Sequence, residues 1–317
     1  MSVFTPVSRA ELEPFLAGFD LGRLLEYRDI IGGAENSNFF VATEQGQFVL
    51  TLVERGPVAD LPFVLELLVH LHNAGLPVPY AIADRQGQTL HQLNGRPALL
   101  QPRLPGNHVQ QPDISHCHAV GVLLAQLHQA TAASGLHRHS DRGLDWIEQQ
   151  LLGDKMVVDS ATAQLLQSMR SEIAQKRQQL AGLPGAVLHA DLFRDNVLFE
   201  GHHLSGVIDF YNAASGPLLY DVAICVNDWC LAPQGGLDNA LIQAWLAGYA
   251  SIRRFNTAEA QAWPTLLRIA ALRFWLSRQQ AMEEHSGQAG VLCKDPEHFM
   301  HLLKHLQVPV STLPLAL

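Results

Sequence analysis

Residues 189–196 decide the fold of this chain, and they read His189-Ala190-Asp191-Leu192-Phe193-Arg194-Asp195-Asn196. A further acidic residue follows in the segment Ile208-Asp209-Phe210. The apolar runs 197–199 and 204–208 lie between them, and we expect a β-hairpin there with Gly201 and Gly206 as turn residues. The sequence thus predicts an Asp on a tight loop, an Asn at the far end of that loop, and a second Asp on the next strand.

These three side chains are the set that phosphoryl transfer from a metal-bound nucleotide requires. Asp191 would orient and deprotonate the hydroxyl that is phosphorylated, while Asn196 and Asp209 would hold magnesium on the phosphates. A short pattern of this kind also arises by chance, and then His189 would be a core histidine while Asp191 and Asn196 hydrogen-bond a turn. The apolar run 186–188 before the loop and the correct order of Asp209 favour the catalytic interpretation.

Composition indicates a folded protein with one large domain or two lobes. The chain has 317 residues, of which 48% are hydrophobic and 16% charged, and this excludes a disordered chain. The 21 Lys and Arg face 30 Asp and Glu, a formal net charge of −9, which argues against nucleic acid as a partner. No apolar run reaches the ~18 residues of a membrane helix, and residues 1–9 lack a secretory pattern. We therefore expect a cytoplasmic protein with no membrane partner.

The cysteines and histidines indicate neither a disulfide framework nor structural zinc. The four cysteines are Cys117, Cys225, Cys230 and Cys293. They form no C-x-x-C pair, so we expect reduced and mostly buried thiols. The 16 histidines include the groups at 116–118, 137–139 and 202–203. Adjacent positions of a helix or strand point in different directions, so these groups are poor chelates.

The first hundred residues predict an antiparallel sheet with one helix on it. Residues 8–11 have the form of a capping box that opens a short helix, which Pro14 should kink or end. The dipeptide Asn94-Gly95 is a strong tight-turn signal. The segment 61–73 has helical apolar spacing and ends at Gly75. The predicted strands are 39–43, 48–53, 89–93 and 98–104.

Helical patterns dominate after a predicted hinge at residues 104–107. Apolar residues at 120, 123, 124 and 127 form a buried stripe in a helix over 115–133. Further helices are predicted over 161–180, 218–231, 239–249, 258–282 and 296–306. A small sheet lobe (1–104) and a larger helical lobe (105–317) make a bilobal α+β architecture, and the cleft between lobes is the expected place for a ligand.

Several further segments carry a resemblance that covers nearly the whole chain. They are residues 33–41, 48–52, 188–199, 205–211, 220–223, 226–230 and 271–278. On these residues the chain resembles the aminoglycoside phosphotransferase and choline kinase superfamily, whose members share a protein-kinase-like fold. Within it the likeness is greatest to the bacterial homoserine kinases of that fold. The resemblance implies an ATP- and Mg²⁺-dependent enzyme that phosphorylates the side-chain hydroxyl of L-homoserine, a step in threonine biosynthesis.

The resemblance implies the same roles for Asp191, Asn196 and Asp209, and it adds roles for two further residues. It implies that Asp221, on the following helix, tethers the backbone of the loop beside His189, as structural support rather than as chemistry. Arg194 would contact the transferred phosphate, or else form a salt bridge to Asp195 or Glu200.

The nucleotide is expected on the sheet lobe. Gly33, Asn36 and Ser37 lie between two predicted strands, where small residues let backbone N–H groups approach phosphates. The adenine would hydrogen-bond the hinge backbone around Gln101 and Arg103. The chain has no G-x-x-x-x-G-K-[ST] segment, which excludes the P-loop class.

One departure from the family concerns Thr51. It occupies the strand position at which kinase-like folds usually place the Lys or Arg that holds the nucleotide phosphates. Glu66 matches the acidic helix partner of that cation but has no obvious Lys to meet, and the alternative is a solvated helix residue. The missing cation leaves open a catalytically inactive, kinase-like regulator.

The substrate is expected beside Asp191. An amino acid brings an ammonium and a carboxylate, so the site needs an acid and an Arg or polar donor. Candidates are Tyr211 and Asp228 for the ammonium, and Arg273 or Arg278 for the carboxylate. These arginines are five apart on a helix and do not share a face, so at most one lies in the site. The rival substrate is another small hydroxylated amine, such as choline or an aminoglycoside, although a polycationic antibiotic would favour a cluster of acids.

Overall fold

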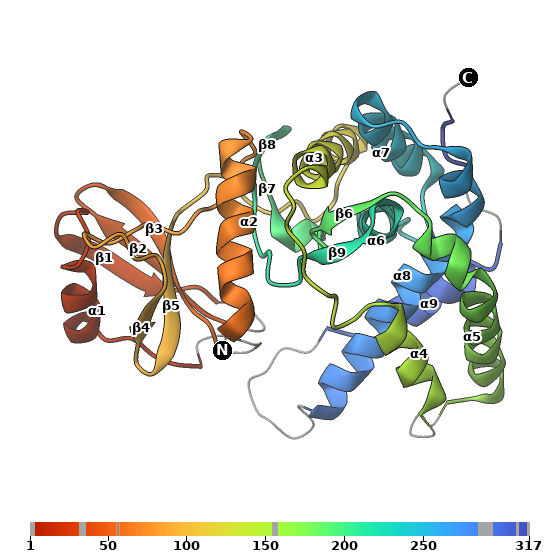
Figure 1. Cartoon of the computed structure of the whole chain (residues 1–317), viewed down its shortest axis with the longest axis horizontal. Coiled ribbons are helices and arrows are strands. Elements are labelled where there is room, and N and C mark those ends of the chain that lie inside the picture. The colour runs from red at the N-terminus through yellow and green to blue at the C-terminus, as the bar shows by residue number, and fades with distance from the viewer. Residues whose placement is uncertain are drawn as a thin grey trace. The chain divides into compact units, whose positions relative to one another are not determined.

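The computed structural model describes residues 4–31, 36–54, 56, 58–153, 158–284, 294–308 and 311–315. The chain divides into two compact units, residues 1–105 with 282–294 and residues 106–281 with 295–317. Figure 1 labels the elements of each unit. Among the residues that the structure describes, every helix falls short of the length and apolarity needed to cross a membrane.

The first unit is built on a five-stranded antiparallel sheet with the order β1-β2-β3-β5-β4. The strands are β1 (Leu24–Asp29), β2 (Ser37–Thr43), β3 (Gly46–Leu52), β4 (His91–Leu93) and β5 (Arg96–Pro102). The hairpins β2–β3 and β4–β5 are the predicted ones. Asn94 and Gly95 both have positive φ, 51° and 73°, as the tight turn between β4 and β5 requires.

One hydrophobic cluster of the first unit lies on one face of this sheet. Alternate residues of β2, including Phe39 and Val41, are buried there. The helix α1 (Arg9–Leu16) packs Leu12 and Leu16 into the same cluster, and it ends two residues after Pro14, as predicted. The predicted second helix is α2 (Leu61–Asn73), which follows a short 3₁₀ turn, η1 (Val58–Asp60).

The second unit is mainly helical. Its helices are α3 (Ile114–Ala132), α4 (Leu144–Leu152), α5 (Ser160–Ala181), α6 (Leu218–Trp229), α7 (Asn239–Ile252), α8 (Thr257–Glu284) and α9 (Glu297–His305). Sequence reasoning missed α4. This helix has nine residues and buries only Ile147 completely, so its apolar periodicity is weak.

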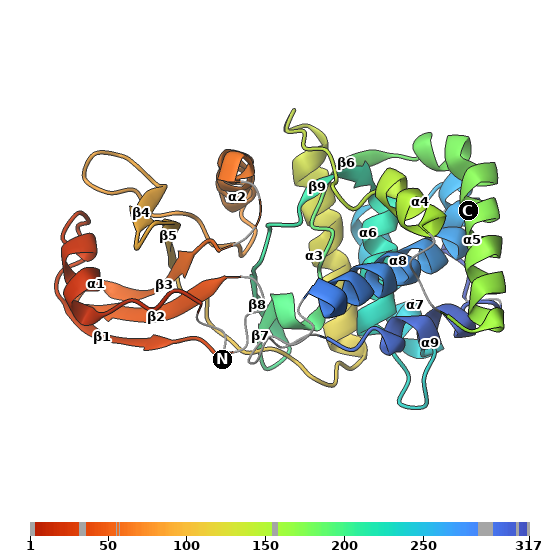
Figure 2. The same ribbon diagram turned by 90° about the horizontal axis from the view of Figure 1, so that it is seen from below.

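Two small antiparallel strand pairs accompany these helices. β6 (Gly185–Leu188) pairs with β9 (Ala214–Pro217), and Figure 2 shows this pair beside α3 and α6. β7 (Val197–Glu200) pairs with β8 (His203–Val207) and is the predicted hairpin. Only one of its two predicted turn residues is in the turn: Gly201 has φ 61°, whereas Gly206 lies within β8 opposite Leu198. Gly206 is a strand residue, because the pairing of β7 with β8 continues to Val207.

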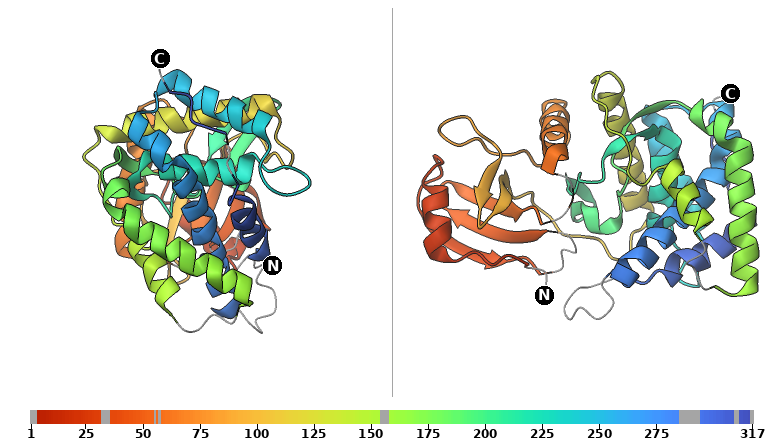
Figure 3. Two further views of the ribbon diagram at one scale, coloured as in Figure 1. Left: turned by 90° about the vertical axis from the view of Figure 1, so that its right-hand side faces the viewer. Right: turned by 60° about the horizontal axis from the view of Figure 1, so that its bottom comes forward.

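The helices α3 and α7 lie side by side (Figures 1 and 3). Their backbones approach each other more closely than they could if a side chain stood at every contact position. Glycines make the approach possible. A Cβ on Gly121 would overlap the carbonyl oxygen of Trp245, and a Cβ on Gly248 would overlap the carbonyl oxygen of His118. Backbone atoms of one helix therefore fill the space of the missing side chain on the other.

Gly248→Ala should lower the free energy of unfolding by about 1–3 kcal/mol, the usual cost of overpacking, because neither helix backbone can move aside without losing its neighbours. Urea unfolding followed by circular dichroism measures this. Gly153→Ala is the matched control, since Gly153 has φ −73° and a Cβ there comes no closer than 3.5 Å to the Gln150 carbonyl oxygen. Equal stability of the two variants would contradict the proposed close contact.

Candidate functional site

The loop between β6 and η2 (Arg194–Asn196) is held by the carboxylate of Asp221, which lies in the first turns of α6. Its Oδ2 accepts from the His189 N–H at 2.8 Å, and its Oδ1 accepts from the Ala190 N–H at 2.9 Å. Ala190 has φ 63°, a left-handed conformation that costs a residue with a side chain about 1–2 kcal/mol. Hydrogen bonds to a charged acceptor contribute about 1.5–3 kcal/mol each and offset this strain. The chain is therefore fixed immediately before Asp191.

The buried side chain of His128 also hydrogen-bonds Asp221. Nε2 of His128, on α3, donates to Asp221 Oδ2 at 3.1 Å, and the Tyr249 hydroxyl of α7 lies 2.8 Å from His128 Nδ1. The side chains of His128 and Asp221 are completely buried. Asp221 thus connects the loop to three helices of the second unit.

His189 links the two ends of the loop region. Its Nε2 donates to the Ile208 carbonyl oxygen at 3.1 Å, and its Nδ1 accepts from the Asp191 N–H at 3.3 Å. Burial lowers the pKa of His189, and the nearby charge of Asp221 only partly opposes this. The neutral ring with hydrogen on Nε2 satisfies both bonds. His189 is therefore a core histidine that positions Asp191, which agrees with the supporting role expected from the sequence.

The β7–β8 hairpin brings the predicted base and metal ligands to one end of two strands. Val197 and Val207 are paired, so Asn196 just before β7 and Asp209 just after β8 flank the same end. The Ile208 N–H donates to the Asn196 carbonyl oxygen at 3.0 Å and closes this end. Asp209 has φ 66°, a second strained residue in the site.

Asp191 accepts hydrogen bonds from the side chains of Asn196 and Asn212. The Asn196 side-chain nitrogen donates to the Asp191 carbonyl oxygen at 2.8 Å, so the remaining amide atom, Oδ1, is the one that suits a cation. The Asn212 side-chain nitrogen donates to Asp191 Oδ2 at 3.3 Å. A carboxylate and an amide oxygen are ligands that fit a hard divalent cation such as Mg²⁺.

Arg194 has a different partner from those expected. Its side chain pairs with Asp228 of α6 through Nε at 3.2 Å and Nη2 at 3.3 Å. The Arg194 N–H also donates to Asp228 at 2.8 Å, and Nη1 donates to the Gln110 carbonyl oxygen. Both oxygens of Asp228 are engaged, because the rigid fork of the guanidinium matches a carboxylate. Asp228 therefore anchors the loop through Arg194, and the substrate contact of Asp228 and the phosphate contact of Arg194 stay predictions.

Three residues that sequence reasoning did not assign complete this support. They are Asn212, His128 and Trp229, whose Nε1–H donates to the Leu192 carbonyl oxygen at 2.9 Å. Asn212 and Trp229 carry no signal in the sequence, because their contacts are made only in the folded chain. His128 does carry one, since it follows the buried stripe of its helix by a single position and is polar on an apolar face.

The predicted substrate residues occupy different surroundings. Burial, and to a smaller extent the charge of Asp209, raises the pKa of the Tyr211 hydroxyl, which is therefore neutral at physiological pH. Arg273 is only 5% exposed, and its guanidinium carbon lies 3.9 Å from the centre of the Phe274 ring. Arg278 instead donates to the Asp295 carbonyl oxygen at 2.9 Å and lies over the Phe299 ring. Burial lowers the pKa of Arg278, while nearby acids that include Asp228 and Asp191 oppose the change, so this cation lies close to the loop.

The residues predicted to bind nucleotide lie in the first unit. Gly33 falls outside the described residues. The Asn36 side-chain oxygen accepts from the Glu54 N–H at 3.1 Å. The Ser37 hydroxyl is completely buried, donates to Glu54 at 2.6 Å and accepts from the N–H groups of residues 4 and 5. The Ser37 hydroxyl therefore holds the local structure together, and the approach of backbone N–H groups of this segment to phosphate stays a prediction.

The residues predicted at the hinge also form backbone hydrogen bonds within the first unit. Gln101 pairs with Val49 in the β3–β5 ladder, and the Arg103 N–H donates to the Gln47 carbonyl oxygen at 3.0 Å. The contact of adenine with the hinge backbone stays a prediction. Thr51 is buried, and its hydroxyl donates to the Asn38 side-chain oxygen at 2.7 Å. Glu66 is exposed on α2, as expected for a solvated helix residue.

Comparison with known proteins identifies relatives over the whole chain. Residues 26–255 match the phosphotransferase enzyme family. The sequence is 54% identical over 317 residues to a homoserine kinase of Pseudomonas aeruginosa (strain LESB58), covering 100% of both chains. It is 41% identical over 307 residues to a homoserine kinase of Methylobacillus flagellatus, covering 96% of this chain and 95% of the other.

Solved structures agree with the fold. An amicoumacin kinase in complex with AMP-PNP and Ca²⁺ is similar with a TM-score of 0.71 at 15% identity, over 95% of this chain and 92% of the other. At this identity the likeness shows the fold alone. The predicted α+β, protein-kinase-like fold is thereby confirmed.

Asp221→Asn should lower the free energy of unfolding by about 2 kcal/mol or more, because the amide nitrogen cannot accept and leaves a buried N–H of the loop unsatisfied. Urea unfolding measures the change. In the matched control, Asp238→Asn at the start of α7, the side chain caps Ala240 and Leu241, and Asn caps as well as Asp does. A similar loss in both variants would contradict the special role of Asp221.

Proposed function

This chain belongs to the phosphotransferase enzyme family and, within it, to the homoserine kinases, and we propose that it transfers the terminal phosphoryl group of ATP to the side-chain hydroxyl of L-homoserine, giving O-phospho-L-homoserine. The observation that carries the proposal is the placement of Asp191, Asn196 and Asp209 around one end of the β7–β8 hairpin. The enzyme acts in the cytoplasm, where ATP and amino acids are both present.

Asn196 Oδ1 and the Asp209 carboxylate would hold Mg²⁺. The hard oxygen donors fit this ion, and the amide nitrogen of Asn196 is already fixed on the Asp191 carbonyl oxygen, which sets the direction of Oδ1. When bound, the ion neutralises charge on the phosphates. The left-handed conformation of Asp209 turns its side chain out of the strand direction of β8 and so serves this purpose.

Asp191 accepts the proton of the substrate hydroxyl. Three contacts hold it in place: its N–H on His189, its carbonyl oxygen on Asn196, and its Oδ2 on Asn212. The hydroxyl proton leaves late in phosphoryl transfer, so Asp191 mainly orients the hydroxyl and then accepts its proton. The fixed orientation supplies most of the benefit, since it converts a bimolecular encounter into a positioned reaction.

For the carboxylate of homoserine, Arg278 is a better candidate than Arg273. The acids of the loop region act on Arg278, whose guanidinium therefore lies close to the place of reaction. Arg273 is almost fully buried against Phe274. We assign Arg278 to the substrate carboxylate and leave Arg273 as a packing residue of α8.

A second candidate function is a catalytically inactive, kinase-like regulator, which the neutral pair of Thr51 and Asn38 favours because no cation stands at that strand position. The intact acids and amide of the hairpin favour the active enzyme. Magnesium-dependent binding of ATP, measured by calorimetry, separates the two, since a regulator of this kind would show none.

Asp191→Asn should reduce homoserine-dependent release of ADP by about 10²–10⁴-fold, the range for loss of a general base, while the affinity for ATP stays the same. Asp195→Asn, in the same loop and exposed, is the matched control and should retain activity. Full turnover by the Asp191 variant would remove this residue from the mechanism.

In a panel with threonine, choline and 3-aminopropanol, only homoserine should give rapid turnover. A preference for another acceptor would contradict homoserine as the substrate but would leave the assignment as a kinase intact.

Arg278→Gln should raise the KM for homoserine about 10- to 100-fold, the equivalent of one charged hydrogen bond, and should leave the KM for ATP unchanged. The poor substrate 3-aminopropanol has no carboxylate, so its KM should not change in the variant. Arg177→Gln on α5, whose guanidinium pairs with Asp145 and Glu148, serves as the control. An equal loss for homoserine and 3-aminopropanol would show that Arg278 does not bind the carboxylate.

A further inference from the structure

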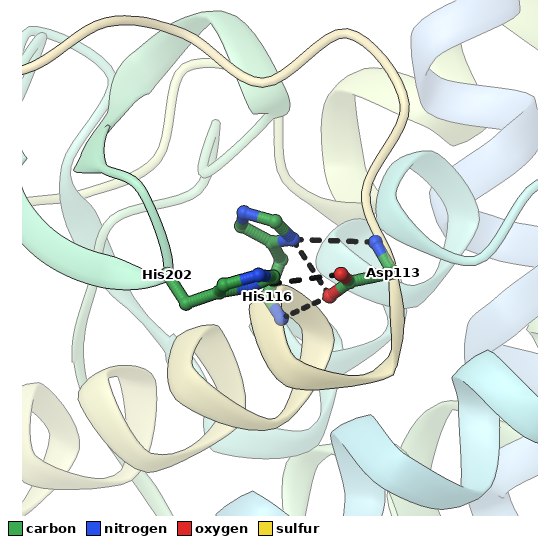
Figure 4. A group of neighbouring side chains, drawn as sticks. All are labelled: Asp113, His116 and His202. Carbon is green, nitrogen blue, oxygen red and sulfur yellow. Dashed lines mark hydrogen bonds and ion pairs between the residues drawn. The ribbon is translucent and has the colours of Figure 1, made fainter.

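One cluster of side chains outside the loop region has the donor set of a transition-metal site. It consists of Asp113, His116 and His202, and one ligand atom of each lies within 4.8 Å of the others (Figure 4). Asp113 and His116 stand at the start of α3, whereas His202 lies in the turn between β7 and β8. Within the described ranges, no other group of three His, Cys or acidic residues comes together in this way.

The ring of His116 is oriented so that Nδ1 faces a carboxylate. Its Nε2 lies 3.2 Å from the Gly201 carbonyl oxygen, and because a carbonyl only accepts, this nitrogen carries a hydrogen. Nδ1 lies 2.7 Å from Asp113 Oδ1, which also only accepts. The Asp113 N–H also donates to Nδ1 at 3.4 Å, as part of the capping box at the start of α3. Nδ1 therefore faces Oδ1 across either its own hydrogen or a metal ion.

This arrangement is the one that metal-binding histidines adopt. Such residues donate their second ring N–H to a backbone carbonyl or a carboxylate, which fixes the ring and the ligand nitrogen. The Gly201 carbonyl oxygen is this acceptor for His116. The ring is 10% exposed and packs edge-on against Phe199, so it is held rigidly.

His202 lies beside His116 and faces the other oxygen of the Asp113 carboxylate (Figure 4). Its Nδ1 lies 3.6 Å from Asp113 Oδ2, and its ring centre is 4.7 Å from that of His116. In a tetrahedral zinc site with bonds of about 2.0 Å, the ligand atoms are about 3.3 Å apart. The separations of 2.7 Å and 3.6 Å lie on either side of this value. The side chain of His202 is 65% exposed, so it can rotate into place and leave a fourth position to water.

We propose that Asp113, His116 and His202 bind one Zn²⁺ ion. Imidazole nitrogens favour zinc over magnesium, so this site and the Asn196–Asp209 pair select different ions. The ion would connect the start of α3 to the turn of the β7–β8 hairpin, whose other end carries Asn196 and Asp209. It therefore stabilises the hairpin without taking part in the reaction. The sequence groups 116–118 and 202–203 are poor chelates separately, but the fold brings one histidine from each to the same carboxylate.

Calorimetric titration of the chelator-treated full chain with Zn²⁺ tests this proposal. We expect one equivalent to bind, with affinity reduced at least tenfold in His202→Ala and in Asp113→Asn. The Asn variant keeps the helix cap, because Asn caps as well as Asp does, and loses only the charged ligand. His203→Ala is the matched control, since His203 is the exposed neighbour and should bind like the parent chain. Zn²⁺ should raise the melting temperature of the parent and of the control, but not of the two site variants.

Co²⁺ provides a second readout, because a tetrahedral ligand set gives it strong visible absorption that is lost in His202→Ala. The proposal is overturned if the chain binds no zinc, or if His202→Ala binds it as the parent does. It is also overturned if Asp209→Asn, and not His202→Ala, abolishes the bound equivalent, because zinc would then occupy the site proposed for magnesium.

Discussion

The hydrogen bonds from two consecutive backbone N–H groups to the Asp221 carboxylate are the constraint on which the site depends. A buried charge is costly unless it is fully hydrogen-bonded, and this one accepts three bonds, including that of His128. The stabilisation allows Ala190 to take a left-handed conformation that its side chain disfavours. The backbone reverses there, and Asp191 follows with its orientation already decided.

The hairpin then acts as a spacer between the remaining functional residues. Asn196 precedes β7 and Asp209 follows β8, so the pairing of Val197 with Val207 sets the distance between the two cation ligands. His189 joins both features, because it contacts the Asp191 N–H and the Ile208 carbonyl oxygen. A change in hairpin register would therefore disturb the cation ligands and the base together. This dependence explains why strain is found at Ala190 and Asp209, next to the chemistry, within a well-packed unit.

Sequence reasoning succeeded where signals are local. The Asn94-Gly95 turn, the alternation of β2 and the apolar spacing of α2 each follow from a few neighbouring residues, and the structure has all three. The spacing within residues 189–196 similarly predicts which side chains carry the chemistry, and this assignment stays a prediction. Sequence reasoning failed where the partner is distant in the chain. Arg194 pairs with Asp228 across 34 positions, and the Ser37 hydroxyl is taken by Glu54 and the N-terminal segment, which no local pattern could indicate.

The neutral pair of Thr51 and Asn38 separates this chain from the usual kinase arrangement, because phosphate charge at that strand has no strand cation to meet it. Most of the charge neutralisation therefore falls to the cation proposed at the β7–β8 hairpin. A crystal structure with Mg²⁺, a non-hydrolysable ATP analogue and L-homoserine tests this claim most directly. It should show the cation about 2.1 Å from Asn196 Oδ1 and an Asp209 oxygen, with the homoserine hydroxyl hydrogen-bonded to Asp191. A cation bound by other residues, or a hydroxyl that faces away from Asp191, would contradict the account.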